Sequence, residues 1–261
     1  MSINFNKKKV LVIGLGETGQ SALHFLANKE CDIQAIDTRP KIDNFETIKE
    51  KFKDVKFTIG EKFNDTIIND VELIIISPGM SLKESYVQKA LNQGIPVIGD
   101  IEMFAQVKSV SSKVIGITGS NGKTTVTSLV GDLLKAAGIS TIVGGNIGIP
   151  ILNTLNQKVP EVYVLELSSY QLESTYSLAL ETAAILNISE DHMDRYGSME
   201  EYAKAKYRIF NHAKNIILNR EDDYLKSQIN ESSLTFGTHL DEKNYGIKKN
   251  GNQYSSFKHK N

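Results

Sequence analysis

Residues 114–125 run Val114-Ile-Gly-Ile-Thr-Gly-Ser-Asn-Gly-Lys-Thr-Thr125, and this stretch decides the fold. An apolar segment typical of a buried strand leads into a glycine-rich loop, followed by Lys123, two threonines and a helical pattern. The N–H groups of such a loop can surround phosphate oxygens, a lysine can neutralise their charge, and a threonine hydroxyl can bind magnesium. The order of these features predicts a nucleoside triphosphate site, for ATP or GTP.

The glycine spacing differs from that of the usual phosphate-binding loop. Ile117 stands where the first glycine is expected, and Gly116 and Gly119 lie on either side, so the loop would have one extra residue. The plain alternative is a glycine turn that joins a strand to a helix, and it gives no role to Lys123 or Thr124. The predicted ATP-binding residues are Gly119, Ser120, Asn121, Gly122, Lys123, Thr124 and Thr125.

The composition is that of a globular chain. Apolar residues make up 40% and charged residues 23% of the sequence, and the net charge of -1 gives no broad basic surface for nucleic acid. No stretch approaches the roughly 18–20 apolar residues of a membrane span, and the polar N-terminus lacks a signal-peptide core. The single cysteine, Cys31, fits a reducing compartment. We expect a cytoplasmic monomer that binds neither nucleic acid nor membrane.

Short apolar runs alternate with helical patterns along the chain. The predicted strands are 10–13, 33–36, 73–76, 96–98, 114–117, 141–143, 162–165, 183–188 and 216–218. The predicted helices are 19–28, 83–92, one that starts at 100, 124–137 and 199–210. Continuous apolar runs such as 73–76 suit strands buried on both faces of a parallel sheet. The fold class is therefore α/β, with a Rossmann-like parallel-sheet domain at 1–99 and a phosphate-loop α/β domain at 100–261.

The end of the chain departs from this alternation. Lys248-Lys-Asn-Gly-Asn252 carries an Asn-Gly hairpin signal. The last residues, Phe257-Lys-His-Lys-Asn261, provide no apolar closure. We therefore expect the second domain to be interrupted here.

A second glycine loop, Gly14-Leu-Gly-Glu-Thr-Gly19, lies between the first strand and the first helix. With Asp37 at the end of the next strand it forms the dinucleotide pattern, which alone would indicate NAD or FAD. Thr38 and Arg39 can bind a phosphate or a uracil edge, and Ser77-Pro-Gly79 ends a strand where ligands gather in open parallel sheets. These neighbours favour a different nucleotide diphosphate.

Three further segments contain charged or ionisable side chains that are candidates for the site around the phosphate loop. Glu166 ends an apolar strand, and a buried carboxylate is costly unless it is paired, so we consider it a magnesium ligand. The segment Asn187–Arg195 also follows a strand, and this position favours His192 facing the nucleotide over a plain solvated loop. Lys204 and Lys206 lie on the following helix, where an exposed polar face is the plain interpretation.

A series of motifs resembles the Mur ligases, ATP-dependent enzymes that form amide bonds in peptidoglycan precursor synthesis. In order, they are Gly14–Gly19, Asp37–Pro40, Ser77–Gly79, Gly99–Phe104, Ile117–Thr125, Gly144–Gly148, Leu165–Glu173 and Asn187–Tyr196. Residues 37–39 and 166–173 resemble the branch that adds D-glutamate. The resemblance implies a UDP domain, a central ATPase domain and a C-terminal domain. We expect this last domain to be missing here, and therefore a truncated chain without ligase activity of its own.

The resemblance also implies roles for individual residues. The positions that match those holding the uridine diphosphate end are Thr18, Thr38, Arg39, Ser77, Pro78 and Gly79. Glu17 departs from the uncharged residue expected there, so its side chain should point away from a pyrophosphate. The positions near the sugar-peptide substrate or the phosphates are Asn146, Ser168, Gln171 and His192. The magnesium positions are Thr124, Glu166, His192 and Lys206, the last as a carbamate.

The implied reaction uses ATP and Mg²⁺ to add D-glutamate to UDP-N-acetylmuramoyl-L-alanine through an acyl phosphate. The catalytic residues would be Lys123, His192 and Lys206. Within the resemblance, the Gly116-to-Gly122 spacing is the family's own form of the loop and ATP is favoured over GTP. Two alternatives remain: a non-catalytic module that binds the UDP substrate, and a nicotinamide-binding protein with an attached ATPase unit.

Overall fold

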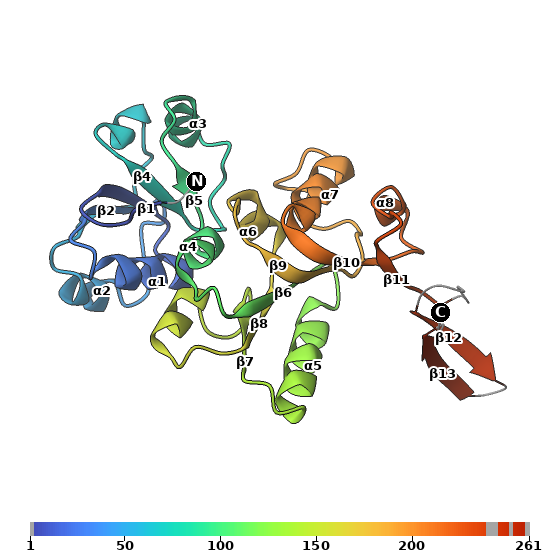
Figure 1. Cartoon of the computed structure of the whole chain (residues 1–261). Helices are drawn as coiled ribbons and strands as arrows, with labels where there is room; N and C mark the ends of the chain where they lie inside the picture. The colour runs from blue at the N-terminus through green and yellow to red at the C-terminus, as the bar shows by residue number, and fades with distance from the viewer. Residues whose placement is uncertain (1–2, 239–244, 251–252, 259–261) are drawn as a thin grey trace. The chain divides into compact units, whose positions relative to one another are not determined.

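Apolar runs along the chain form two separate β-sheets, each with helices packed against it (Figure 1). The computed structural model describes residues 3–238, 245–250 and 253–258. The first unit comprises Met1–Ser109, Gly148–Val159 and Tyr170–Leu178, and the second Val110–Ile147, Pro160–Ser169 and Ala179–Asn261. Each unit is thus built from three separate segments of the chain, whereas the predicted boundary at residue 99 divides the chain only once. That boundary stays a prediction.

The first unit has a five-stranded parallel sheet with the order β3-β2-β1-β4-β5. Its strands are β1 (Lys9–Ile13), β2 (Asp32–Asp37), β3 (Lys56–Ile59), β4 (Leu73–Ile76) and β5 (Val97–Ile98). Its helices are α1 (Glu17–Leu26), α2 (Phe45–Lys51), η1 (Asp65–Ile68), α3 (Ser85–Asn92), α4 (Asp100–Val107) and η2 (Ile151–Asn156). The short α6 (Ser169–Glu173) has its first residue in the second unit.

The central strands of this sheet are buried on both faces. Leu11 and Ile74 pack with Val87 of α3, whereas Val10 and Ile75, which point the other way, are buried as well. A strand covered on both sides has no place for polar residues, which explains the unbroken apolar run of β4. The expectation from that run is confirmed.

The second unit has an eight-stranded sheet with the order β13-β12-β11-β10-β9-β6-β8-β7, parallel except between β12 and β13. Its strands are β6 (Lys113–Thr118), β7 (Thr141–Gly145), β8 (Val162–Glu166), β9 (Leu180–Ile185), β10 (Ala213–Asn219), β11 (Leu234–Phe236), β12 (Tyr245–Asn250) and β13 (Gln253–Lys258). Its helices are α5 (Lys123–Ala136), α7 (Met199–Tyr207), η3 (Arg208–Phe210) and α8 (Asp223–Lys226).

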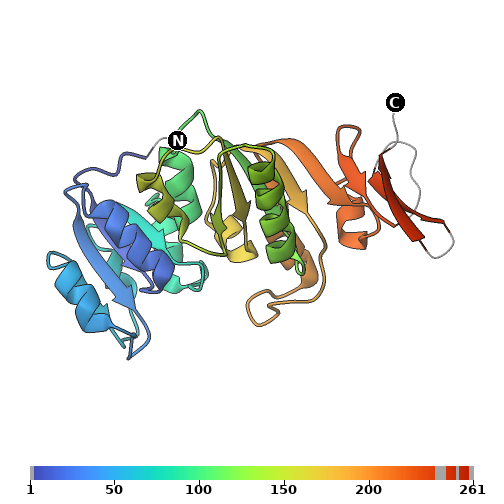
Figure 2. The same ribbon diagram turned by 90° about the horizontal axis from the view of Figure 1, so that it is seen from below.

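Helices cover both faces of this sheet around β6. Ile115 and Ile117 of β6 belong to the cluster that contains Val126 and Val130 of α5. Figure 2 shows α5 lying over this face of the sheet. Gly116 points to the opposite face, where a Cβ would lie 3.3 Å from Ile209 of η3. Alternation along β6 therefore separates two packed layers.

The structure adds elements that the sequence pattern did not predict. The helix α2 and the strand β3 lie between the predicted strands at 33–36 and 73–76, where the pattern predicts no element. The strand β3 is an edge strand of mostly half-exposed residues, so it needs no continuous apolar run. The hairpin signal is consistent with the antiparallel pairing of β12 and β13, in which Asn250 lies opposite Gln253. Residues 251–252 lie outside the described part. No helix among the described residues has the length and apolar character to cross a membrane.

Candidate functional site

The first glycine loop lies where the strand order of the first sheet reverses, beside β1 and β4. The Ser77 amide donates to the carbonyl of Ile13 at 2.8 Å, and the Ser77 hydroxyl to that of Gly14 at 3.0 Å. Gly14 has a φ of 90°, and a Cβ there would lie 2.8 Å from Cβ of Ser77. Only glycine allows this close approach. In open α/β sheets this reversal is the ligand-binding position.

Open space adjoins this loop at two glycines. A Cβ added to Gly16 or to Gly79 would meet no atom within 4 Å. Gly16 is also the N-cap of the ten-residue helix α1, whose first amides carry partial positive charge. Glu17 is exposed, and the expectation that its side chain avoids a bound pyrophosphate stays a prediction. The loop can therefore accept a phosphate group on its open side.

Asp37 is fully engaged by its neighbours. Arg39 donates from Nε to Oδ1 at 2.9 Å and from a terminal nitrogen to Oδ2 at 2.6 Å, and the Leu15 amide donates to Oδ2 at 2.8 Å. Burial would raise the pKa of Asp37, but these hydrogen bonds outweigh it and the pKa lies below its ordinary value. A carboxylate held in this way is poorly placed to accept both hydroxyls of a ribose, which counts against the nicotinamide alternative.

All six predicted uridine-diphosphate residues follow the carboxyl ends of β1, β2 and β4. They are Thr18, Thr38, Arg39, Ser77, Pro78 and Gly79, and none of them is fully buried. The structure thus brings the sequence-predicted positions to one edge of the first sheet.

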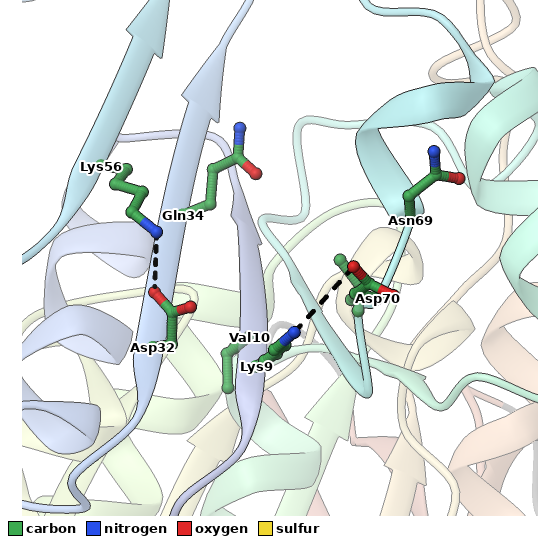
Figure 3. Close-up of a pocket in the computed structure, with 8 residues that line it drawn as sticks. Lys9, Val10, Asp32, Gln34, Lys56, Asn69 and Asp70 are labelled. Atoms are coloured by element: carbon green, nitrogen blue, oxygen red, sulfur yellow. Dashed lines mark hydrogen bonds and ion pairs between the residues drawn. The ribbon is translucent and has the colours of Figure 1, made fainter.

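A polar hollow of about 230 Å³ lies at the opposite edge of the same sheet (Figure 3). It is lined in part by Lys9, Asp32 and Lys56, the first residues of β1, β2 and β3. Lys56 pairs with Asp32 at 3.3 Å and Lys9 with Asp70 at 4.0 Å, as the dashed lines show. Its charges are therefore paired within the protein, and it lies away from the glycine loop.

The phosphate loop follows β6 and ends at Gly122, which caps α5 with a φ of 79°. The Lys123 ammonium donates to the carbonyls of Gly119 and Ser120, each at 2.9 Å. Because β6 lies between β8 and β9, segments from both neighbours flank the loop. This position matches the one predicted from the sequence.

Glu166 ends β8 beside the start of α5 and is buried. The Thr124 hydroxyl donates to its Oε2 at 2.8 Å, and the Asn146 side-chain amide to its Oε1 at 2.8 Å. Asn146 directly follows β7. Three residues chosen from distant parts of the sequence thus meet at one carboxylate.

Lys206 is only 2% exposed, and its ammonium donates to the carbonyl of Gly119 at 2.9 Å. Burial, and then the charge of Lys123, lower the pKa of Lys206 to about 7. The interpretation of an exposed polar face holds for Lys204, which is exposed, and is wrong for Lys206. Two lysines therefore converge on one carbonyl of the phosphate loop.

His192 lies in the loop after β9 with a φ of 56°. Its Nε2 is 3.4 Å from a carboxylate oxygen of Asp191, and its ring centroid is 6.4 Å from that of Tyr202. The same Tyr202 ring lies 4.6 Å from the Lys206 ammonium. One buried aromatic ring thus contacts two of the three predicted catalytic residues, His192 and Lys206.

Gln171 is buried in the first unit, where its side-chain amide lies 3.5 Å from Oδ2 of Asp100. Burial raises the pKa of Asp100 to about 6. Glu102, on the same helix, accepts hydrogen bonds from the amides of Tyr176 and Ser177 at 2.7 and 2.8 Å. These carboxylates hold the segment that carries Gln171. Ser168 is half-buried and belongs to the second unit.

Two family models match this chain. The Mur ligase middle domain matches residues 117–260, and the Mur ligase MurD-like, N-terminal domain matches residues 8–99. The chain belongs to the Mur ligase family. This Mur ligase is 47% identical over 237 residues to a UDP-N-acetylmuramoylalanine--D-glutamate ligase of Methylobacillus flagellatus, covering 90% of this chain and 52% of the relative. It is 45% identical over 248 residues to the enzyme of that name from Pasteurella multocida, covering 95% and 55%.

The chain spans about half the length of these curated relatives. Among solved structures it resembles the UDP-N-acetylmuramate:L-alanyl-gamma-D-glutamyl-meso-diaminopimelate ligase from Neisseria meningitides, with a TM-score of 0.59 at 18% identity, covering 96% of this chain and 84% of that one. A murein peptide ligase from Psychrobacter arcticus gives a TM-score of 0.53 at 16% identity, covering 97% and 59%. These likenesses support the α/β fold.

The side chains at the phosphate loop can be compared with the ligands that a magnesium ion needs. Among the residues that the structure describes, no group of three or more His, Cys, Asp or Glu side chains could hold a metal ion. A nucleotide-bound magnesium needs only one or two protein ligands, because phosphates and waters complete its shell. The adjacent oxygens of Thr124 and Glu166, 2.8 Å apart, fit that requirement.

Sequence reasoning gave no role to three residues that contact the phosphate loop: Asn187, Ser189 and Tyr202. Asn187 and Ser189 lie in the run chosen for His192, directly after a strand. That strand proves to be a neighbour of β6, and strand neighbours are not visible in the sequence. Tyr202 looks like an ordinary helix residue until α7 is packed.

Proposed function

We propose that this Mur ligase chain supplies the UDP-substrate and ATP units of a ligase that adds D-glutamate to UDP-N-acetylmuramoyl-L-alanine. The observation that carries the proposal is the convergence of Lys123 and Lys206 on the Gly119 carbonyl, with the Thr124–Glu166 pair at the same loop. Relatives of 41–47% identity that bear the name of this activity support the choice of substrates.

The first chemical step is attack of the L-alanyl carboxylate on the γ-phosphorus of ATP. The new oxygen–phosphorus bond forms as the bond to ADP breaks, and the loop amides with Lys123 stabilise the charge on the transferring group. A magnesium ion at Thr124 and Glu166 would neutralise phosphate charge there. Lys206 contacts the Gly119 carbonyl of the same loop, and the Tyr202 ring lies beside both Lys206 and His192.

The second step is attack of the D-glutamate amine on the acyl carbonyl. Its carbon–nitrogen bond forms, phosphate leaves, and the amine loses a proton to give the amide. The acyl phosphate already carries the activation, so the contribution of the protein is to orient the two reactants and exclude water.

We also propose that Lys206 acts as a carbamate and not as an ammonium. Its burial and its pKa of about 7 favour the neutral amine, which is the form that reacts with carbon dioxide. The carbamate would add an anionic oxygen ligand at the phosphate loop and remove one of two neighbouring positive charges. The resemblance to the family implies this modification.

Calorimetry tests the two binding units separately. We expect binding of MgATP and of UDP-N-acetylmuramoyl-L-alanine, with UDP alone binding more weakly than the full substrate. Lys123→Met should weaken MgATP binding by about tenfold to a hundredfold, because charge-assisted hydrogen bonds to phosphate are lost. It should leave the UDP compound unaffected.

The matched control is Lys135→Met, which removes an exposed lysine from the last turn of the same helix. It should bind MgATP like the unchanged chain. Binding of NAD without binding of either UDP compound would refute the proposal and favour the nicotinamide alternative.

A further inference from the structure

Two loops of the second unit are joined by a set of reciprocal hydrogen bonds at the phosphate loop. The Asn187 side chain accepts from the Asn121 amide at 2.8 Å and donates to the Asn121 carbonyl at 3.0 Å. The Ser120 amide in turn donates to the Asn187 carbonyl at 2.9 Å. One asparagine side chain therefore satisfies both backbone groups of a loop residue 66 positions away.

Side chains of the phosphate loop reach back to the same neighbour. The Ser189 amide donates to the Ser120 hydroxyl at 2.9 Å, and that hydroxyl donates to the Ser189 carbonyl at 2.9 Å. The Asn121 side chain donates to the Ser189 hydroxyl at 3.1 Å. We call Ser120, Asn121, Asn187 and Ser189 the loop clamp.

The loop clamp leads to the predicted catalytic residues. The Ser120 hydroxyl lies 3.1 Å from the hydroxyl of Tyr202, which is fully buried in α7. The ring of Tyr202 contacts Lys206 and His192. The clamp therefore ties the phosphate loop to the segment after β9 and to α7 at the same point.

The loop clamp also divides the amides of the phosphate loop into two groups. Those of Ser120 and Asn121 are directed at Asn187 and are used within the protein. The first turn of α5, which starts at Lys123, presents amides that have no partner within the helix. Anions bind at such helix starts, so the amides of residues 123–125 are placed to receive a phosphate, whereas the Val126 amide donates to the Gly122 carbonyl.

We propose that Asn187 and Ser189 are positioning residues that hold the phosphate loop in its nucleotide-binding conformation. This inference rests on the proposed function of the loop as an ATP site. The physical reason is preorganisation. If only a fraction of the protein molecules hold the loop in its binding conformation, the apparent affinity for the ligand falls to that same fraction of its full value. Glycines at 119 and 122 give the loop other conformations, and the clamp selects one of them.

Calorimetry on Asn187→Ala measures this selection. We expect the affinity for MgATP to fall by on the order of tenfold, because two hydrogen bonds that fix the loop are lost. Hydrogen exchange of amides 119–125 in the ligand-free chain should become faster. Binding of the UDP compound to the first unit should not change.

Asn215→Ala is the matched control. The Asn215 side chain also donates to a backbone carbonyl of the same unit, that of Glu181 at 2.7 Å, and has no part in the loop clamp. Its MgATP affinity should equal that of the unchanged chain. A loss of affinity in both variants would mean that general destabilisation, not positioning, is measured, and would overturn the inference.

A double-mutant cycle of Asn121→Ala and Ser189→Ala provides a second measurement. It tests the inference even if the Asn187→Ala variant does not fold. Their side chains bond to each other, so the two effects on MgATP affinity should be far from additive. Additive effects, or an Asn187→Ala chain that binds MgATP normally, would refute the positioning role of the loop clamp but leave the proposed function standing. Failure of the unchanged chain to bind MgATP would instead refute the proposed function.

Discussion

At the residue scale, the two lysines that contact the phosphate loop have different surroundings. Lys123 starts α5 and is half-buried, whereas Lys206 is buried within α7. Both donate to the Gly119 carbonyl, so their charges repel. Lys206 relieves this repulsion by giving up its proton near neutral pH, since its pKa is about 7.

Carbon dioxide should therefore react with Lys206 in a pH-dependent way. The amine nitrogen attacks carbon dioxide, one carbon–oxygen π bond breaks, and a proton leaves to solvent. Because the pKa is lowered to about 7, the reactive neutral amine dominates above that pH and is lost below it. A ¹³C NMR signal of the carbamate should rise as the pH increases through 7 in ¹³C-bicarbonate.

Two methionine variants identify the lysine that carries this signal. Lys206→Met should abolish it, and Lys204→Met, which changes an exposed lysine on the same helix, should keep it. A signal that survives in Lys206→Met would contradict the carbamate proposal at this position.

At the element scale, α5 packs onto β7 at a glycine. Gly131 lies in the middle of the helix and is buried, and an added Cβ would be 2.3 Å from Cγ2 of Val143. A glycine inside a helix costs about 1 kcal/mol relative to alanine. The helix accepts this cost because the close contact with the strand leaves no room for a methyl group.

Gly131→Ala should therefore lower the free energy of unfolding, by about 1–2 kcal/mol, although alanine is the better helix former. The expectation follows because Val143 has a stiff, β-branched side chain that cannot turn away freely. Urea unfolding monitored by circular dichroism measures the change. Ser128→Ala, at an exposed position of the same helix, should raise stability by a few tenths of a kcal/mol. A more stable Gly131→Ala chain would show that the contact is loose.

The elements that the sequence predicted well are those with continuous apolar runs. The strands β1, β4, β6 and β8 were expected almost at their observed bounds, because their residues are buried on both faces. The strand β9 starts at Leu180, three residues before the expected start, since the polar residues Glu181 and Thr182 masked it. The strand β3 was not predicted because, as an edge strand, it has partly exposed residues and no continuous apolar run.

At the scale of the whole molecule, each unit has its own sheet and its own loop site. The first sheet carries the Gly14–Gly19 loop, and the second carries the Gly119–Gly122 loop. Both loops lie where the strand order reverses, which is the general ligand position in open α/β sheets. The two nucleotide ligands should therefore protect different amides.

Hydrogen exchange with each ligand tests this separation. MgATP should slow exchange at residues 119–126 and 186–189, and UDP should slow it at residues 14–19 and 77–79. Binding removes the local opening of the loop that holds the ligand. Protection of residues 119–126 by UDP equal to that by MgATP would contradict two separate sites.

The sequence by itself determined the fold class, the two glycine loops and the site residues next to them in the chain. Local order is enough for these, because a strand, a glycine turn and a helix start place Lys123 and Thr124 within one short segment. The pairing of Thr124 with Glu166, the burial of Lys206 and the loop clamp were decided only by the tertiary structure. They depend on β8 and β9 lying on either side of β6, and strand order arises from packing over distances that no local pattern records.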